Sequence, residues 1–272
     1  MAHFNPAQAQ PLEPLLDLVD VDITRGKRQL LCNLNLAFNA GEFIALAGEN
    51  GCGKSSLLTV LGGLAPLEKG TLSFNGQPLS EISLQRLADY RAVMAQSAST
   101  PFGFLVDEIL QLARHHIVES PANRHHIIGE IAEQFDITHL LSRNIQTLSG
   151  GERQRVFLSK AILQLLPISS HDSLEGKLLL LDEPTSALDL RHQKLVMQQL
   201  VSLSQQGLCI VCVSHDLNLI SPYCSRMILL AEQGCIADDK PENALTIDTL
   251  ARCYHTQLNL IRNLDNDVFV TH

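Results

Sequence analysis

The segment Gly48-Glu-Asn-Gly-Cys-Gly-Lys-Ser55 constrains the fold more than any other stretch of this 272-residue chain. It matches the pattern G-x-x-x-x-G-K-[ST], a loop whose backbone amides surround a phosphate group. The apolar residues 43–47 before it predict a buried strand, and residues 55–64 after it have helical periodicity. A helix that begins at such a loop directs its positive end at the bound anion. The sequence therefore predicts an α/β fold with a phosphate-binding loop.

Each residue of this loop is expected to contact a nucleotide. Lys54 should reach the β- and γ-phosphates, and the Ser55 hydroxyl should ligate Mg²⁺. A thiol at Cys52 would lie beside the phosphates, so we expect its modification to block nucleotide binding. The predicted nucleotide-binding residues are Gly48, Glu49, Asn50, Gly51, Cys52, Gly53, Lys54, Ser55 and Ser56.

A pair of carboxylates follows a second apolar run. Residues 178–181 are all leucine, which predicts a buried strand, and Asp182 and Glu183 come directly after it. Asp182 is suited to hold Mg²⁺ through water. Glu183 is placed where a carboxylate can polarise the water that attacks a γ-phosphate. We therefore predict that Asp182 is a metal-site residue and that Glu183 is catalytic.

A second phosphate-binding helix terminus is predicted at Leu148-Ser-Gly-Gly-Glu152. The Ser149 hydroxyl and the two glycine amides open a predicted helix there. One domain needs a single phosphate cradle, so a second cradle implies a nucleotide held between two chains. The residues expected to contact the partner's nucleotide are Leu148, Ser149, Gly150, Gly151 and Glu152.

These motifs, in this order, resemble the ABC transporter ATPase family, whose signature is LSGGQ; Glu152 stands here in place of the glutamine. The resemblance covers about residues 14–260 and implies one P-loop NTPase cassette. Its α/β core is a mostly parallel sheet, with an antiparallel β subdomain and a helical subdomain inserted at about residues 97–160. Residues 1–13 are expected to be a flexible leader and residues 261–272 a C-terminal tail.

The resemblance also implies roles for residues outside these motifs. Gln96 resembles the Q-loop glutamine, which meets Mg²⁺ and the attacking water. His215 resembles the switch histidine, which contacts the γ-phosphate. The expected catalytic residues are therefore Glu183, His215 and Gln96, and the expected Mg²⁺ site is Ser55, Gln96 and Asp182. The D-loop is expected at Ser186, Ala187, Leu188 and Asp189.

One family feature is missing from the first predicted hairpin. The family usually has an aromatic residue there that stacks on adenine, and Arg25 occupies that position. A guanidinium plane can stack on a base. Arg25 can equally be a solvated loop residue, so both interpretations stay open.

The resemblance further implies ATP and Mg²⁺ as cofactors, ATPase activity and a homodimer that docks on a membrane permease dimer. A periplasmic substrate-binding protein would be an indirect partner, and the location would be peripheral, on the cytoplasmic face of the bacterial inner membrane. Residues 91–96, 181–193 and 214–219 resemble the haem, siderophore and vitamin B12 importer branch. Haem importers are the most similar, followed by vitamin B12 and then ferric siderophore importers. A soluble ABC ATPase unconnected to transport is the distant alternative.

Composition excludes some other functions. The formal net charge of −9 disfavours nucleic acid as a partner, because phosphate contacts need clustered basic residues. Cys209 and Cys212 are three apart in one predicted strand and should face opposite sides of the sheet, which disfavours a redox or metal pair. The histidine pairs at 115–116 and 125–126 are expected to be solvated surface residues.

Overall fold

The computed structural model describes residues 13–96, 103–168, 173–232, 234–256, 258–262 and 268–271. The predicted leader, except for residue 13, lies outside these ranges, as do parts of the segment after Gln96, of the loop at 167–176 and of the tail. No helix in the described ranges has the length and hydropathy needed to span a bilayer.

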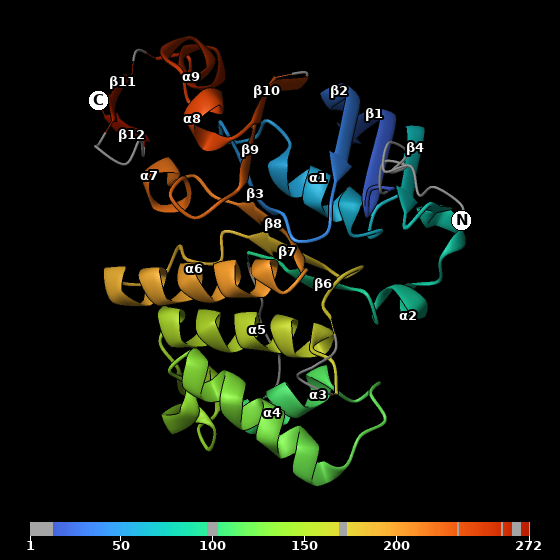
Figure 1. Ribbon diagram of the computed structural model, residues 1–272, viewed down its shortest axis with the longest axis vertical. Helices are drawn as coiled ribbons and strands as arrows, with labels where there is room; N and C mark the ends of the chain where they lie inside the picture. Colours follow the sequence, from blue (N-terminus) through green and yellow to red (C-terminus); the bar gives the residue numbers. More distant parts are fainter. Residues whose placement is uncertain are drawn as a thin grey trace, which may run out of the picture.

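A mostly parallel sheet forms the centre of the molecule (Figure 1). Within the described residues it has six strands in the order β10-β9-β3-β8-β7-β6, parallel except for the β9–β10 pair. The inner strands are apolar along their whole length because helices and a second sheet cover both faces. The strands are β3 Phe43–Gly48, β6 Arg91–Met94, β7 Leu178–Asp182, β8 Cys209–Val213, β9 Arg226–Ala231 and β10 Gly234–Asp239.

An antiparallel sheet lies over one side of this core. Its order among the described residues is β2-β1-β4-β5, with Asn75 and Gly76 in the left-handed turn that joins the last two strands. Helix α1, Lys54–Leu61, packs between the two sheets and contacts β1, β3, β7 and β8. The strands are β1 Leu16–Arg25, β2 Arg28–Phe38, β4 Lys69–Phe74 and β5 Gln77–Pro78. The predicted fold class is confirmed.

The inserted helices α3, α4 and α5 and the core helix α6 lie on the opposite side of the central sheet (Figure 1). Helix α6 packs against β3 and β8, α5 packs against β6, and α3 and α4 pack against α5. Helix α5 continues beyond the boundary expected at residue 160. It therefore belongs both to the helical subdomain and to the core. The helices are α3 Val106–Ala113, α4 Pro121–Gln134, α5 Gly150–Leu165 and α6 Leu190–Gln205.

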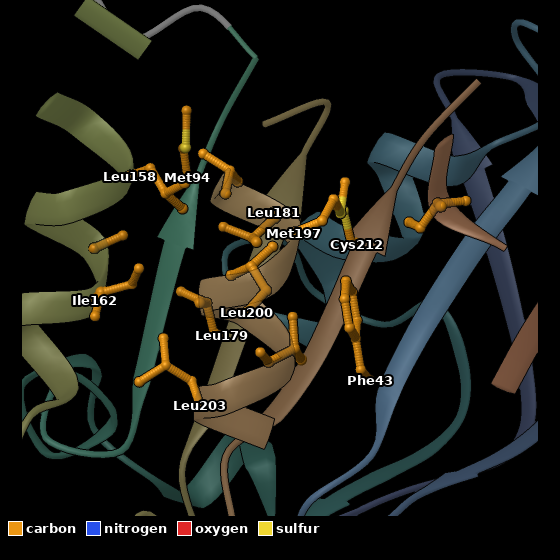
Figure 2. Packing of buried hydrophobic residues seen from close by; sticks show 14 of the residues in the cluster. Phe43, Met94, Leu158, Ile162, Leu179, Leu181, Met197, Leu200, Leu203 and Cys212 are labelled. Atoms are coloured by element: carbon orange, nitrogen blue, oxygen red, sulfur yellow. The ribbon is translucent and has the colours of Figure 1, made fainter. Parts of the chain in front are cut away.

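The core under α5 and α6 is closely packed. Figure 2 shows Leu179 and Leu181 of β7 facing Met197, Leu200 and other side chains of the flanking helices, with Phe43, Met94, Leu158, Ile162, Leu203 and Cys212 nearby. Full burial of one such side chain contributes about 1.5–3 kcal/mol. Cys212 belongs to this core, whereas Cys209 belongs to the core on the other face of the sheet. The prediction that the two thiols face opposite sides is confirmed.

A buried ion pair holds the helical subdomain to α5. The fully buried Arg114 donates from Nε and Nη2 to the two carboxylate oxygens of Glu119, both at 2.8 Å. Its Nη1 also donates to the carbonyl oxygens of Leu163 (3.0 Å) and Leu166 (2.9 Å) at the end of α5. These bonds hold the pKa of Glu119 at about 2, with the Arg114 hydrogen bond as the largest cause. No motif predicted this pair.

The remaining elements are short. Part of the expected tail is β12, which pairs antiparallel with β11, and its Val270 exchanges two backbone hydrogen bonds with the Asn218 side chain. The short elements are α2 Leu84–Leu87, α7 Leu217–Ile220, α8 Pro241–Ala244, α9 Ile247–Tyr254, β11 Asn259–Arg262, β12 Val268–Thr271 and three 3-10 turns at Leu79–Glu81, Thr138–Leu140 and Ile145–Thr147.

Candidate nucleotide site

The glycine-rich loop connects β3 to α1 and wraps around a lysine. Lys54 is buried, and its Nζ donates to the carbonyl oxygens of Gly48 (2.7 Å) and Glu49 (2.8 Å). Gly48 has φ 143°, and a Cβ there would overlap the Leu230 carbonyl oxygen, so only glycine fits. Gly53, with φ 116°, turns the chain into the first turn of α1. The loop therefore presents an ammonium group and a helix N-terminus at one place.

Asp182 lies at the carboxyl end of β7, next to the start of α1. The Ser55 hydroxyl is hydrogen-bonded to its carboxylate. Burial nevertheless raises the pKa of Asp182, and the neighbouring Glu183 raises it further. A hydroxyl and a desolvated carboxylate are oxygen ligands of the kind that Mg²⁺ prefers, and they leave room for water and phosphate oxygens in its octahedron. The residues present therefore fit a Mg²⁺ site.

Glu183 is held between two polar side chains. Gln96 donates from Nε2 to Glu183 Oε2 at 2.8 Å, and His215 Nδ1 lies 3.2 Å from Glu183 Oε1. The Glu183 backbone has φ 52°, and its N–H donates to the Val213 carbonyl oxygen at 3.1 Å. A non-glycine residue in this left-handed region is strained and occurs mainly where its surroundings fix it. This backbone conformation directs the carboxylate away from the strand and toward the cavity described below.

A cavity of about 610 Å³ joins Lys54, Ser55, Gln96, Glu183 and His215, whereas Asp182 is not among its lining residues. It brings together sequence-predicted residues from the loop and from the ends of four strands, β1, β6, β7 and β8. Sequence reasoning missed three of its lining residues, Arg28, Leu30 and Val213, because no motif marks them. The lining residues are Arg25, Arg28, Leu30, Asn50, Gly51, Gly53, Lys54, Ser55, Ser56, Gln96, Glu183, Val213 and His215.

Arg25 lies at the end of β1, at the mouth of this cavity. Arg28, across the turn, also lines it and forms an exposed ion pair with Glu232 at 2.9 Å. The position of Arg25 suits a contact with the outer part of a nucleotide, although its side chain is exposed.

The signature segment does not line this cavity. Ser149 is the N-cap of α5: its Oγ accepts from the Glu152 N–H at 3.3 Å, and Glu152 Oε2 accepts from the Ser149 N–H at 2.7 Å. This reciprocal capping box accommodates Glu and Gln alike, which explains how Glu152 replaces the family's glutamine. The same bonds lower the pKa of Glu152, with the Ser149 backbone as the largest cause.

The segment 186–189, expected from the sequence to be the D-loop, lies against the first turn of α5 through Ala187 and Leu188. A Cβ on Gly151 would lie 2.8 Å from the Ala187 carbonyl oxygen, so this position needs glycine. Asp189 caps α6, accepting from the His192 N–H at 2.9 Å. Sequence reasoning missed Gln154 of α5, whose side-chain amide bonds to residues of this crossing segment.

The thiol of Cys52 is largely covered. Its exposed fraction is 4%, and burial raises its pKa. Because the thiolate is the reactive form of cysteine, burial and the raised pKa both disfavour reaction of this thiol, and the block of nucleotide binding by its modification stays a prediction. Among the described residues, no group of three His, Cys, Asp or Glu side chains is arranged to hold a metal ion, the two histidine pairs included.

Comparisons with known proteins agree with this architecture. The model of the family described as ABC transporter matches residues 31–186. The hemin import ATP-binding protein of Idiomarina loihiensis is 39% identical over 89% of this chain and 93% of its own length. That of Escherichia coli O157:H7 is 37% identical over 88% of this chain and 91% of its own length. A solved chain of a metal-chelate type ABC transporter in an inward-facing conformation is 25% identical with a TM-score of 0.74, covering 94% of this chain and 96% of that one. The chain belongs to the ABC transporter family.

Proposed function

We propose that this chain binds and hydrolyses ATP and thereby drives haem import through a partner permease in the bacterial inner membrane. The placement of Glu183 is the observation that supports ATP hydrolysis. Its carboxylate is held by Gln96 and His215 at the wall of a cavity that also contains Lys54. This arrangement is suited to activate a water molecule next to a bound triphosphate.

Each residue has a chemical task in this proposal. Lys54 leaves the carbonyl oxygens that it contacts and neutralises the β- and γ-phosphates, while the loop amides bind their oxygens. Glu183 accepts a proton from the attacking water, and His215 contacts the γ-phosphate. Ser55, Asp182 and Gln96 would hold Mg²⁺, which neutralises charge on the phosphates when bound.

Two copies are proposed to hold two ATP molecules between them. Ser149 and the glycine amides at the start of α5 lie outside the cavity of their own chain and are free to contact the partner's γ-phosphate. The helix N-terminus supplies the positive end of a dipole there. Hydrolysis removes the γ-phosphate that holds the two copies together and resets the dimer.

The permease is proposed to dock on the helical subdomain. Leu105 and Leu112 are exposed apolar side chains there, and a hollow of about 330 Å³ lies beside α3. This docking surface begins shortly after Gln96 in the sequence. Residues 97–102, which connect the two, lie outside the described residues. In the proposal, closure of the nucleotide site is transmitted along this connection to the docking surface. The hollow is lined by Phe104, Glu108, Gln111, Leu112, His115 and Arg124.

The cargo is proposed from the relatives. Two proteins named for hemin import share more than a third of their residues with this chain over nearly their whole length. The structural neighbour is described as a metal-chelate type transporter, which supports the same branch and keeps vitamin B12 and ferric siderophores as alternatives. A periplasmic substrate-binding protein would deliver the cargo, and the chain would lie on the cytoplasmic face of the membrane.

The test is transport by the purified complex. The chain is tagged, isolated with the permease that co-purifies with it, and reconstituted into vesicles with the periplasmic binding protein. We expect ATP-dependent haem uptake, and none with Glu183→Gln. Uptake of vitamin B12 or a ferric siderophore instead of haem would replace the cargo assignment. Absence of any permease in the purified material would contradict the transport role.

A further inference from the structure

Gln154 joins the signature helix to the backbone of the catalytic carboxylate. It lies in the second turn of α5, and both ends of its side-chain amide are bonded. Nε2 donates to the Glu183 carbonyl oxygen at 2.8 Å and to Ser186 Oγ at 3.2 Å. Oε1 accepts from the Ala187 N–H at 2.9 Å. One side chain therefore binds Glu183, Ser186 and Ala187, three residues of the segment that leads from Glu183 into the D-loop.

Close packing makes this junction stiff. Gly151 fits against the Ala187 carbonyl oxygen with no room for a Cβ, and a Cβ on Gly150 would lie 3.6 Å from that of Ala187. The first turn of α5 and the D-loop therefore cannot slide independently. A displacement of the signature glycines is carried to the D-loop through direct contact.

The Glu183 backbone is the part of the site that needs such support. Its left-handed φ of 52° costs on the order of 1 kcal/mol or more for a non-glycine residue. Its carbonyl oxygen accepts from Gln154 and from the Ser186 hydroxyl, the latter at 3.2 Å. The hydrogen bond from Gln154 thus stabilises the conformation that directs the carboxylate toward Gln96 and His215.

We propose that Gln154 is a positioning residue that couples the two ATP sites of the dimer. The proposal rests on the proposed function, in which the start of α5 binds the partner's ATP and Glu183 acts on the chain's own. ATP bound by Ser149, Gly150 and Gly151 draws the first turn of α5 toward the partner. Gln154 transmits that movement to Glu183, so that each site is completed only when the other is occupied.

Three variants of the full-length chain test this role in the complex with the permease. Gln154→Ala removes all three bonds. Gln154→Glu keeps the acceptor for the Ala187 N–H but loses the donors when ionised. Gln164→Ala is the matched control, because Gln164 lies on the same helix and also donates to two backbone carbonyls, of Ala88 (2.8 Å) and Arg91 (3.1 Å), away from the D-loop.

For Gln154→Ala we expect kcat to fall about tenfold, equivalent to about 1.4 kcal/mol, with KM for ATP changed by less than about twofold. The Hill coefficient for ATP should fall toward 1. Gln154→Glu should show the same loss at pH 8 and recover activity relative to wild type as the pH falls, because the protonated carboxyl regains a donor. Gln164→Ala should keep the wild-type kcat and Hill coefficient.

Two results would overturn the coupling role. The first is an unchanged kcat and Hill coefficient in Gln154→Ala. The second is a loss of activity that parallels lower thermal stability and weaker ATP binding, with no recovery of Gln154→Glu at low pH, which would make the residue purely structural. Failure of the proposed function is distinguishable, because wild-type chain would then lack ATPase activity altogether.

Discussion

The Gln96 side chain donates a 2.8 Å hydrogen bond to the Glu183 carboxylate, although the two residues are 87 positions apart in the chain. Gln96 follows β6 and Glu183 follows β7, and these strands are parallel neighbours in the central sheet. The carboxyl ends of both strands therefore lie at the same edge of the sheet. A displacement of Gln96 therefore acts directly on the carboxylate proposed to activate water.

Glu183→Gln should abolish turnover and retain nucleotide. Loss of a general base typically lowers the rate about 10²–10⁴-fold. The neutral amide also removes the negative charge that faces the γ-phosphate, so ATP should hold two copies together. Phosphate release and size-exclusion chromatography with ATP and Mg²⁺ measure the two effects. A Glu183→Gln protein that hydrolyses ATP at a rate close to wild type would contradict the catalytic role.

Asp182→Asn should raise the thermal stability of the nucleotide-free chain while abolishing Mg²⁺-dependent activity. Burial raises the pKa of Asp182, so the folded chain keeps this proton to a higher pH than the unfolded chain. Stability therefore falls as the pH rises through the interval between the two pKa values, and the cost persists at neutral pH. Asn carries no charge and avoids this cost.

Calorimetry of the Asp182→Asn chain from pH 8 down to the ordinary range of a carboxyl pKa, about 4, measures this difference. The gain in Tm over wild type should narrow as the pH falls. Asp189→Asn is the control, and it should lower the Tm. The hydrogen bond from the His192 N–H lowers the pKa of Asp189, so the ionised carboxylate stabilises the fold. A lower Tm for Asp182→Asn at pH 8 would show that the desolvation cost is not the dominant effect.

Arg114→Ala should destabilise the helical subdomain strongly. It leaves the buried Glu119 carboxylate with only Arg124 at 3.2 Å and Asn123 at 3.0 Å as partners, and breaking a buried ion pair typically costs about 3–5 kcal/mol. The pKa of Glu119 is lowered to about 2, so the pair's contribution is present above the ordinary carboxyl value and is lost only as the pH falls toward 2. Urea unfolding at pH 7 measures the loss.

Arg252→Ala provides the comparison for the Arg114 variant. Arg252 is paired with Asp248 at 3.8 Å on an exposed helix face, where such pairs contribute about 0–1 kcal/mol. The double change Arg114→Met with Glu119→Leu should recover part of the stability lost in Arg114→Ala, because neither charge of the pair then stays buried and only the partly exposed Arg124 loses its partner. Equal losses for Arg114→Ala and Arg252→Ala would refute the buried-pair interpretation.

Glu152→Ala should lower stability by about 0.3–1.5 kcal/mol, because it removes the acceptor for the Ser149 N–H at the start of α5. Glu152→Gln should lose less, because glutamine also completes a capping box. It gives up the negative charge that strengthens the bond from the Ser149 N–H, and with it the half-exposed ion pair with Arg143 at 3.4 Å. Thermal unfolding of the Glu152→Ala and Glu152→Gln chains measures the two losses of stability. A larger loss for Glu152→Gln than for Glu152→Ala would exclude the capping explanation.

The local motifs were predictable because each depends on a short stretch of chain. The loop at 48–55 needs glycines and a lysine at fixed spacing, and the apolar runs at 178–181 and 209–213 can only be buried strands. The mostly parallel sheet was implied by the resemblance that these motifs carry. Ser149 and the residues that follow it likewise predicted the start of a helix, which the structure places at the beginning of α5.

Contacts between distant segments were not visible in the sequence. Nothing in the composition of α5 indicates that Gln154 bonds to the backbone of Glu183, because amides occur throughout the chain and only the approach of the D-loop selects this one. The burial of Arg114 is equally hidden, since its run of neighbours, which includes two histidines, is typical of a solvated helix end. The pairing of strands β11 and β12 is marked by no motif in the sequence.

The sequence by itself determined which chemical groups this chain offers to a triphosphate, because the loop and strand patterns are encoded by neighbouring residues. Only the tertiary structure decided how those groups are held. Sheet order brings Gln96, Glu183 and His215 together, and the crossing of α5 by the D-loop ties the signature to the carboxylate. Such contacts depend on distances through space, which the spacing along a chain does not specify.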